Sequence, residues 1–136
     1  MSQKNYILYT PDHEWIAYLS NGTYMGISGF KLTGIRKIDD VRLFSATPNN
    51  TVVKGTPLLH LFYKDYLIAV QAPVDCKVLA VNKVITLGLW ERIIQDPEGL
   101  GWLFKIEPVS DDRGHLITKD AYQTRFQSPA TKETIY

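Results

Sequence analysis

Short β-type segments separated by turn signals are the feature that most constrains how this chain folds. Tyr6–Tyr9 ends at a Thr-Pro-Asp turn, and the segments Glu14–Leu19 and Thr23–Ile27 flank the dipeptide Asn21-Gly22. Asn-Gly between two apolar runs favours a tight hairpin, because a type I′ turn needs positive φ at both central residues. The three segments together predict an antiparallel meander.

The same pattern continues through the middle of the chain. Val41–Ala46 alternates apolar and polar residues, as a half-buried strand does, and apolar segments follow at 58–70 and 72–82. Gly101–Ile106 predicts a closing strand. We therefore predict a mainly β fold, a small barrel or sandwich with short strands and frequent turns.

Two segments depart from the strand pattern. In residues 28–40, the spacing of Phe30, Ile35 and Ile38 predicts one face of a short helix. Residues 83–95 predict the one longer helix, because apolar side chains recur there at helical spacing.

The chain becomes polar beyond Pro108, with Ser-Asp-Asp-Arg-Gly from residue 110 and Ser-Pro-Ala-Thr-Lys-Glu-Thr near the end. We expect one domain at 1–109 and a C-terminal extension at 110–136 that is partly disordered or docks on the body or on a partner. Tyr122 and Phe126 are the apolar residues that would pin this extension.

Composition and charge argue against several classes of function. The net charge is +1 and no long block of one sign occurs, which argues against a nucleic-acid or membrane partner. The first ten residues lack the apolar run of a signal peptide, and no stretch approaches the ~20 apolar residues of a transmembrane helix. Cys76 is the only cysteine, so we expect no internal disulfide and an inert thiol in a cytoplasmic protein.

The sequence offers no assembled catalytic or metal site. Asp12, His13 and Glu14 are chain neighbours whose side chains diverge at a strand entry, whereas a zinc ion needs three or four converging ligands. His60 lies in Leu-Leu-His-Leu and is interpreted as a partly buried, hydrogen-bonded residue. Neither a G-x-G-x-x-G loop nor a G-x-S-x-G motif occurs, so we expect no metal and no enzymatic activity.

One charged turn interrupts the apolar stretch that follows Pro57. Lys64 and Asp65 stand between Tyr63 and Tyr66 in the sequence F-Y-K-D-Y-L. The pair is either a polar, solvated turn or a turn that displays its lysine for chemistry. The flanking tyrosines suit a protein contact, because aromatic rings bury large areas at low entropy cost, or a cross-strand pair that stiffens the hairpin.

Six sequence blocks, in order, resemble the glycine cleavage H-protein family. They are Y-T-P-D-H-E-W-I near the start, M-G-I-S from residue 25, D-V at residue 40, V-V-K-G-T-P from residue 52, A-P-V-D-C-K-V-L-A-V-N at 72–82 and D-P-E-G-L-G-W-L-F-K-I at 96–106. Together they span residues 6 to 108, which is most of the chain.

This resemblance implies both a fold and a role. The fold is the flattened β-barrel, or barrel-sandwich hybrid, of lipoyl and biotinyl carrier domains, with short helices around it. Such proteins hold covalent lipoate on a hairpin lysine, accept an aminomethyl group after the P protein decarboxylates glycine, and pass it to the T protein. The L protein then reoxidises the lipoyl group. The implied partners are these proteins and a lipoate ligase, and the H protein itself catalyses nothing.

The hairpin is where the chain departs from the family pattern. An alignment without gaps from Gly55 to Pro73 places the family's attachment lysine on Asp65, with Lys64 one residue earlier. Neighbouring residues project in different directions, so the shift changes how the amine is presented, unless a one-residue bulge restores the register. Two readings follow: lipoate on Lys64, or an unmodified H-like protein that binds a partner through residues 63–66.

Overall fold

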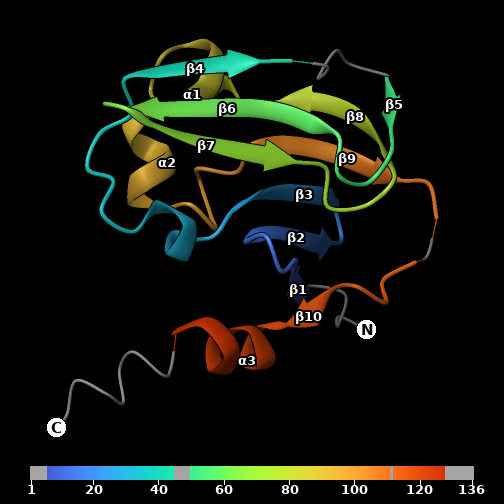
Figure 1. The fold of residues 1–136 in the computed structure, drawn as a ribbon. Helices are drawn as coiled ribbons and strands as arrows, with labels where there is room; N and C mark the ends of the chain where they lie inside the picture. The colour runs from blue at the N-terminus through green and yellow to red at the C-terminus, as the bar shows by residue number, and fades with distance from the viewer. Residues whose placement is uncertain (1–5, 45–49, 111, 128–136) are drawn as a thin grey trace, which may run out of the picture.

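The fold consists of two β-sheets that pack against each other around one core (Figure 1). The computed structural model describes residues 6–44, 50–110 and 112–127. The strands are β1 (Tyr6–Tyr9), β2 (Glu14–Leu19), β3 (Gly22–Ile27), β4 (Asp40–Leu43), β5 (Thr51–Val52), β6 (Pro57–Tyr63), β7 (Tyr66–Gln71), β8 (Cys76–Val81), β9 (Phe104–Pro108) and β10 (Ile117–Thr118). The seven-stranded sheet has the order β10-β1-β2-β3-β9-β8-β5, and the three-stranded sheet has the order β4-β6-β7.

Apolar side chains from both sheets meet in the space between them. Strands β2 and β3 contribute Ile16 and Met25, and strands β6 and β7 contribute Leu59, Leu61 and Val70, all of them fully buried. Residues at alternate strand positions face the same side, so each strand presents one apolar face to this core. Burying each such side chain stabilises the fold by about 1.5–3 kcal/mol. The mainly β prediction is confirmed, with two sheets that remain open rather than closing into a continuous barrel.

The first hairpin forms as predicted, but its turn lies one residue earlier. Leu19 pairs with Gly22, so the central residues are Ser20 and Asn21 rather than Asn21 and Gly22. Asn21 does not have positive φ, and the predicted type I′ turn is therefore wrong. Gly22 instead begins β3 with φ of 142°, where a side chain would clash with a neighbouring lysine.

The helical elements are all short. They are a 3₁₀ turn η2 (Gly29–Leu32), α1 (Lys83–Thr86), α2 (Glu91–Gln95), α3 (Lys119–Tyr122) and a π-helical turn η3 (Gln123–Gln127). None of those within the described ranges has the length and apolar content that a membrane crossing requires.

Both helix predictions need correction. Residues 28–40 contain only the η2 turn, and Phe30 is exposed while Ile38 is buried, so the two do not share a helical face. The helix predicted at 83–95 is split into α1 and α2 at Gly88, whose φ of 76° is incompatible with an α-helix. Periodicity alone could not show that the backbone reverses there.

Two strand predictions have shifted bounds. The strand predicted at Val41–Ala46 is β4, which ends at Leu43, while Ala46 lies outside the described residues. The closing strand predicted at 101–106 is β9, which starts at Phe104 and ends at Pro108.

The C-terminal extension packs on the body over the part that the structure describes. β10 pairs with β1, and α3 follows it beside the larger sheet (Figure 1). Tyr122 is buried and stacks on Tyr9 with ring centroids 4.2 Å apart, and Phe126 lies against Tyr122 at 5.1 Å. As predicted, Tyr122 and Phe126 hold the extension against the body. The boundary at residue 109 stays a prediction, and residues 128–136 lie outside the described ranges.

Candidate functional site

The β6–β7 hairpin ends in a two-residue turn made of Lys64 and Asp65. Tyr63 pairs with Tyr66 across the base of this turn. Lys64 has φ of 54° and Asp65 does not have positive φ, which is the φ pattern of a type II′ turn. Glycine is the usual residue at the first position of such a turn, because a side chain there is strained. The lysine therefore occupies a backbone position that does not suit it sterically.

The register of this hairpin is regular near the turn and irregular at its base. Pairs run without a break from Leu59↔Val70 to Tyr63↔Tyr66, and the register shifts between Pro57 and Leu59. The extra residue in β6 is consistent with a β-bulge at that point. The bulge lies within the segment from Gly55 to Pro73 that was aligned without gaps, while the pairing between the bulge and the turn is regular.

Contacts around the turn hold its backbone and leave its side chains exposed. The Lys64 backbone N–H donates to Asp39 Oδ2 at 2.9 Å. The Lys64 ammonium lies 5.3 Å from the ring centroid of Tyr63, so the lysine side chain folds back over its neighbour. The rings of Tyr63 and Tyr66 stack at 6.4 Å. The predicted cross-strand tyrosine pair is present, and Lys64 and Asp65 are both exposed to solvent.

An exposed aromatic surface covers the outer face of the three-stranded sheet. The His60 ring packs edge-on against Phe44 at 4.5 Å and lies 6.2 Å from Phe62. The Arg42 guanidinium lies 5.9 Å from the Phe62 ring. His60 is half-buried, but it has no hydrogen-bond partner among the described residues, so the predicted hydrogen bond is absent there.

The Asp12-His13-Glu14 segment does not assemble a metal site. Asp12 is exposed, while Glu14 is buried and its carboxylate accepts hydrogen bonds from the Thr10 hydroxyl at 2.7 Å and the Lys31 ammonium at 3.2 Å. His13 points to a different partner, the Tyr122 hydroxyl. The three side chains diverge as predicted, and the described residues contain no group of three potential ligands that could hold a metal ion.

A buried hydrogen-bond chain links this segment to the C-terminal extension. The Tyr122 hydroxyl lies 2.7 Å from His13 Nδ1 and 2.6 Å from the Ser28 hydroxyl. Burial lowers the pKa of His13 below its ordinary value, and the nearby Lys31 ammonium lowers that pKa further. Burial also raises the pKa of the Tyr122 hydroxyl. Sequence reasoning missed this hydrogen-bond chain, because His13, Ser28 and Tyr122 are far apart in the sequence.

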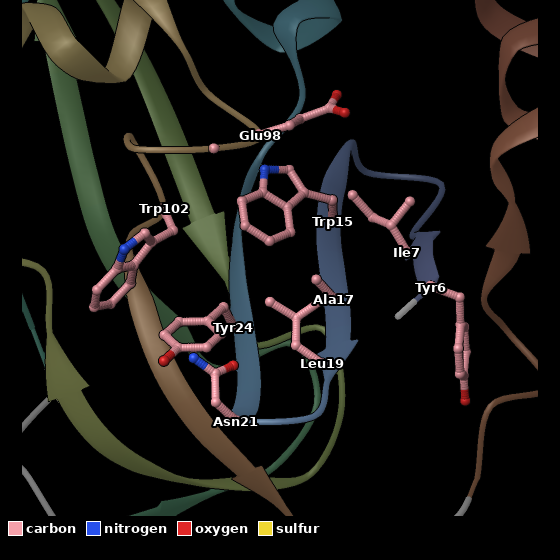
Figure 2. Close-up of a pocket in the computed structure, with 10 residues that line it drawn as sticks. Tyr6, Ile7, Trp15, Ala17, Leu19, Asn21, Tyr24, Glu98 and Trp102 are labelled. Atoms are coloured by element: carbon pink, nitrogen blue, oxygen red, sulfur yellow. The ribbon is translucent and has the colours of Figure 1, made fainter. Parts of the chain in front are cut away.

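A second feature that sequence reasoning missed is an aromatic groove on the seven-stranded sheet (Figure 2). The groove has a volume of about 470 Å³ and lies on the face turned away from the core. Trp15 and Ala17 on β2 line it together with Tyr24 on β3 and Trp102, and Glu98 stands at one end. The alternation of Trp15 and Ala17 with buried Ile16 is the signal that could have predicted a second apolar face.

Cys76, as predicted, is a buried thiol. Burial raises its pKa to about 12, and the Asp75 carboxylate adds to the increase. A thiol with this pKa is almost entirely protonated near neutral pH and is a poor nucleophile.

Comparison with known proteins identifies relatives over nearly the whole chain. The family model described as glycine cleavage H-protein matches residues 7–128. The glycine cleavage system H protein of Listeria monocytogenes (serotype 4b, strain F2365) is 31% identical over 124 residues, covering 90% of this chain and 97% of that protein. The same protein of Thermobifida fusca is 30% identical over 114 residues, covering 84% and 87%.

A solved structure supports the fold independently. The crystal structure of a glycine cleavage system H protein from Mycobacterium marinum matches with a TM-score of 0.72 at 23% identity, covering 92% of this chain and 98% of that one. This match confirms the predicted lipoyl-domain-like fold. From the family match and these relatives, we conclude that the chain belongs to the glycine cleavage H-protein family, a family of carrier proteins rather than of enzymes.

Proposed function

We propose that this chain is an H-family protein that docks on partners through its hairpin tip, residues 63–66, and carries no lipoate on Lys64. The observation that carries the proposal is the turn closed by Tyr63 and Tyr66, in which Lys64 is the first central residue and Asp65 the second. The gapless alignment assigns the family's attachment position to Asp65. A carboxylate offers no amine to form the amide bond that holds lipoate.

The family supplies the class of partner. Proteins of this family carry covalently attached lipoate and work with other enzymes of the glycine cleavage system. The relatives match over most of this chain, so the scaffold that would face those enzymes is present. We therefore propose that the partners are the P, T and L proteins of that system, and that this chain binds them in a complex.

The exposed side chains at the tip support docking. Tyr66 is 64% exposed and Leu67 is 50% exposed, directly beside the charged pair. A large aromatic side chain that loses little entropy on binding is typical of the residues that dominate interface energies. The Tyr63 ring lies nearly parallel to the Tyr66 ring, with the ring centroids 6.4 Å apart.

A second candidate function is lipoyl transfer through Lys64. The observation that favours it is the exposed position of this lysine in a tight turn between two core strands, which is how a carrier arm needs to be displayed. Lys64 would form the amide bond, and the bound lipoyl group would supply the site that accepts the aminomethyl group. Lys64 is exposed, as this role requires, but in the gapless alignment it lies one residue before the position of the family's attachment lysine.

Binding measurements with purified P, T and L proteins test the docking proposal. We expect Tyr63→Ala and Tyr66→Ala each to weaken binding about tenfold or more, with little change in thermal unfolding. Leu19→Ala is the matched control, because Leu19 is an exposed apolar residue, 39% exposed, on the other sheet. Unchanged binding in both tyrosine variants would show that the tip is not the contact surface.

A further inference from the structure

We propose that the aromatic groove on the seven-stranded sheet binds a flat organic cation, an aromatic amine whose ring enters the groove and whose ammonium faces Glu98 (Figure 2). The groove is lined by β1, β2 and β3 of the larger sheet and by the segment before β9, whereas the hairpin tip belongs to the smaller sheet. The inference therefore does not depend on the state of Lys64 or on what the tip binds.

A small residue in the middle of β2 opens the aromatic groove. Ala17 pairs with Ile7 on β1 and with Tyr24 on β3, so these three side chains form one row on the same face of the sheet. The larger side chains of Trp15 and Leu19 lie two residues away on either side along β2, on the same face. The methyl group of Ala17 is therefore the floor of a hollow with larger side chains around it.

The spacing of the strands gives this hollow the width of an aromatic ring. β1 and β3 lie on either side of β2, so their backbones are about 9.6 Å apart, twice the spacing of neighbouring strands. A planar ring between two walls needs about 7–8 Å between the wall carbons, since each contact takes about 3.5–4.0 Å. A flat ring between Ile7 and Tyr24 fits this spacing. The volume of the groove, about 470 Å³, lies in the range of small-molecule sites.

Aromatic rings stand along the groove and favour a cation. The rings of Tyr24 and Trp102 meet at 71° with their centroids 4.9 Å apart. The Trp15 indole lies face-on over Gly26, where an added Cβ would come within 2.9 to 3.0 Å of three ring atoms. The faces of such rings carry negative potential and attract cations, tryptophan most strongly. An aromatic amine therefore gains both ring contacts and cation–π attraction in this groove.

Glu98 supplies the charge that selects a cation. It is half-buried, and it is the one charged residue among the described residues that line the groove. Its Oε1 accepts a hydrogen bond from the Tyr9 hydroxyl at 2.7 Å, and burial raises the pKa of this hydroxyl, so Tyr9 stays neutral. No ion pair compensates the Glu98 charge within the described part of the chain. A carboxylate accepts several hydrogen bonds, which leaves its second oxygen available to an ammonium group.

Two cations near the groove do not compensate Glu98. The side chain of Lys105 passes over Gly22, at the end of the groove opposite Glu98. The Arg113 guanidinium lies 3.9 Å from the ring of Tyr18. Because successive side chains of a strand alternate, Tyr18 faces the side of β2 opposite the groove. The groove therefore has a negative end at Glu98 and a positive end at Lys105.

These two ends orient the ligand. Glu98 stands at the Trp15 end, because the Trp15 Nε1–H donates to the carbonyl of Pro97 at 2.9 Å. The hollow over Ala17 lies two residues along β2 from Trp15, about 6.6 Å. This length is comparable to the reach from an indole ring to an ammonium on a two-carbon linker. A ring over Ala17 therefore places such an ammonium beside Glu98.

A matched set of probes tests the site on the full chain. Tryptamine has a flat ring and an ammonium, indolepropionate has the same ring and linker but ends in a carboxylate, and propylamine has the ammonium without the ring. Binding is followed by the indole N–H signals in NMR spectra, with Trp90, which does not line the groove, as the internal reference. We expect tryptamine to bind saturably with a Kd below ~1 mM and to shift Trp15 and Trp102 but not Trp90. We expect the other two probes to bind about tenfold more weakly or worse.

Glu98→Gln is the deciding variant. Glutamine keeps the size of the side chain and an acceptor for the Tyr9 hydroxyl, but it removes the charge. We expect it to weaken tryptamine binding about tenfold and to remove the preference for tryptamine over indolepropionate. Glu91→Gln is the matched control, because Glu91 is exposed and does not line the groove, and we expect it to bind tryptamine as the native chain does. Ala17→Leu fills the hollow and is expected to abolish binding.

Three results would each overturn the proposal. They are no saturable binding of tryptamine to the folded native chain, equal binding of indolepropionate, and an affinity for tryptamine that Glu98→Gln leaves unchanged. Unchanged binding to a folded Ala17→Leu variant would also overturn it, because the ligand would then lie elsewhere. If Ala17→Leu does not fold, the comparison of Glu98→Gln with Glu91→Gln decides.

Discussion

At the residue scale, Lys64 combines an exposed position with an unfavourable backbone conformation. A φ of 54° costs an L-residue about 1 kcal/mol or more, and glycine adopts it without that cost. We predict that Lys64→Gly raises the free energy of unfolding by about 1 kcal/mol relative to Lys64→Ala, measured by chemical denaturation. Lys64→Ala is the control because it removes the same side chain contacts and keeps the strain. Equal stability of the two variants would contradict the turn geometry.

His13 gives the chain a specific pH dependence. Because its folded-state pKa is lower than its ordinary value of about 6.5, the unfolded chain binds more protons at acidic pH. This contribution to stability is therefore complete above the unfolded pKa and declines as pH falls through 6.5 toward the lowered value. Denaturation at pH 7.5 and 5.5 is expected to show a larger loss in the native chain than in His13→Asn, which tolerates the positive φ at this position.

If the native chain and His13→Asn lose the same stability between pH 7.5 and pH 5.5, the loss comes from titratable groups other than His13.

At the element scale, one buried hydroxyl fastens the C-terminal extension to the body. We predict that Tyr122→Phe destabilises the fold by about 1–3 kcal/mol, since it leaves His13 Nδ1 and the Ser28 hydroxyl without their shared partner. Tyr9→Phe is the matched control. Tyr9 donates to Glu98 Oε1 at 2.7 Å, but Glu98 is only half-buried, so water replaces that bond at lower cost. An equal loss in both variants would contradict the account.

Elements with a repeating pattern were predictable from sequence, and elements set by single backbone angles were not. Short apolar segments bounded by turn signals predicted the strands of the meander, and the charged pair that interrupts the apolar stretch 58–70 predicted the turn there. The turn at Asn21 was displaced by one residue, and the helix through Gly88 was split. At both positions the local structure depends on the φ angle of a single residue. The residue types found there permit that angle but do not require it.

The candidate site also has a part that was predictable from the sequence and a part that was not. Tyr63, Lys64, Asp65 and Tyr66 are contiguous, so their placement in one turn followed from the sequence. The hydrogen-bond chain from His13 to Tyr122 joins segments that are distant in sequence. Only the packing of the extension on the body brings those residues together.

At the scale of the whole molecule, the chain has the fold of its family over nearly its whole length. The family match covers residues 7–128, and the Mycobacterium marinum H protein matches the fold with a TM-score of 0.72. In the function proposed above, the order of Lys64 and Asp65 is what distinguishes a binding protein from a carrier. A scaffold tolerates this change easily, because both residues are exposed and neither contributes to the core.

The central claim is tested most directly by the intact mass of the protein after co-expression with a lipoate ligase and lipoate. The Listeria monocytogenes H protein, expressed in the same way, is the positive control for the ligase. We predict no lipoyl adduct on the native chain and an adduct on the double variant Lys64→Ala with Asp65→Lys, which moves the lysine into the family register. A lipoyl adduct on the native chain that is lost in Lys64→Ala would contradict the account and establish the carrier function.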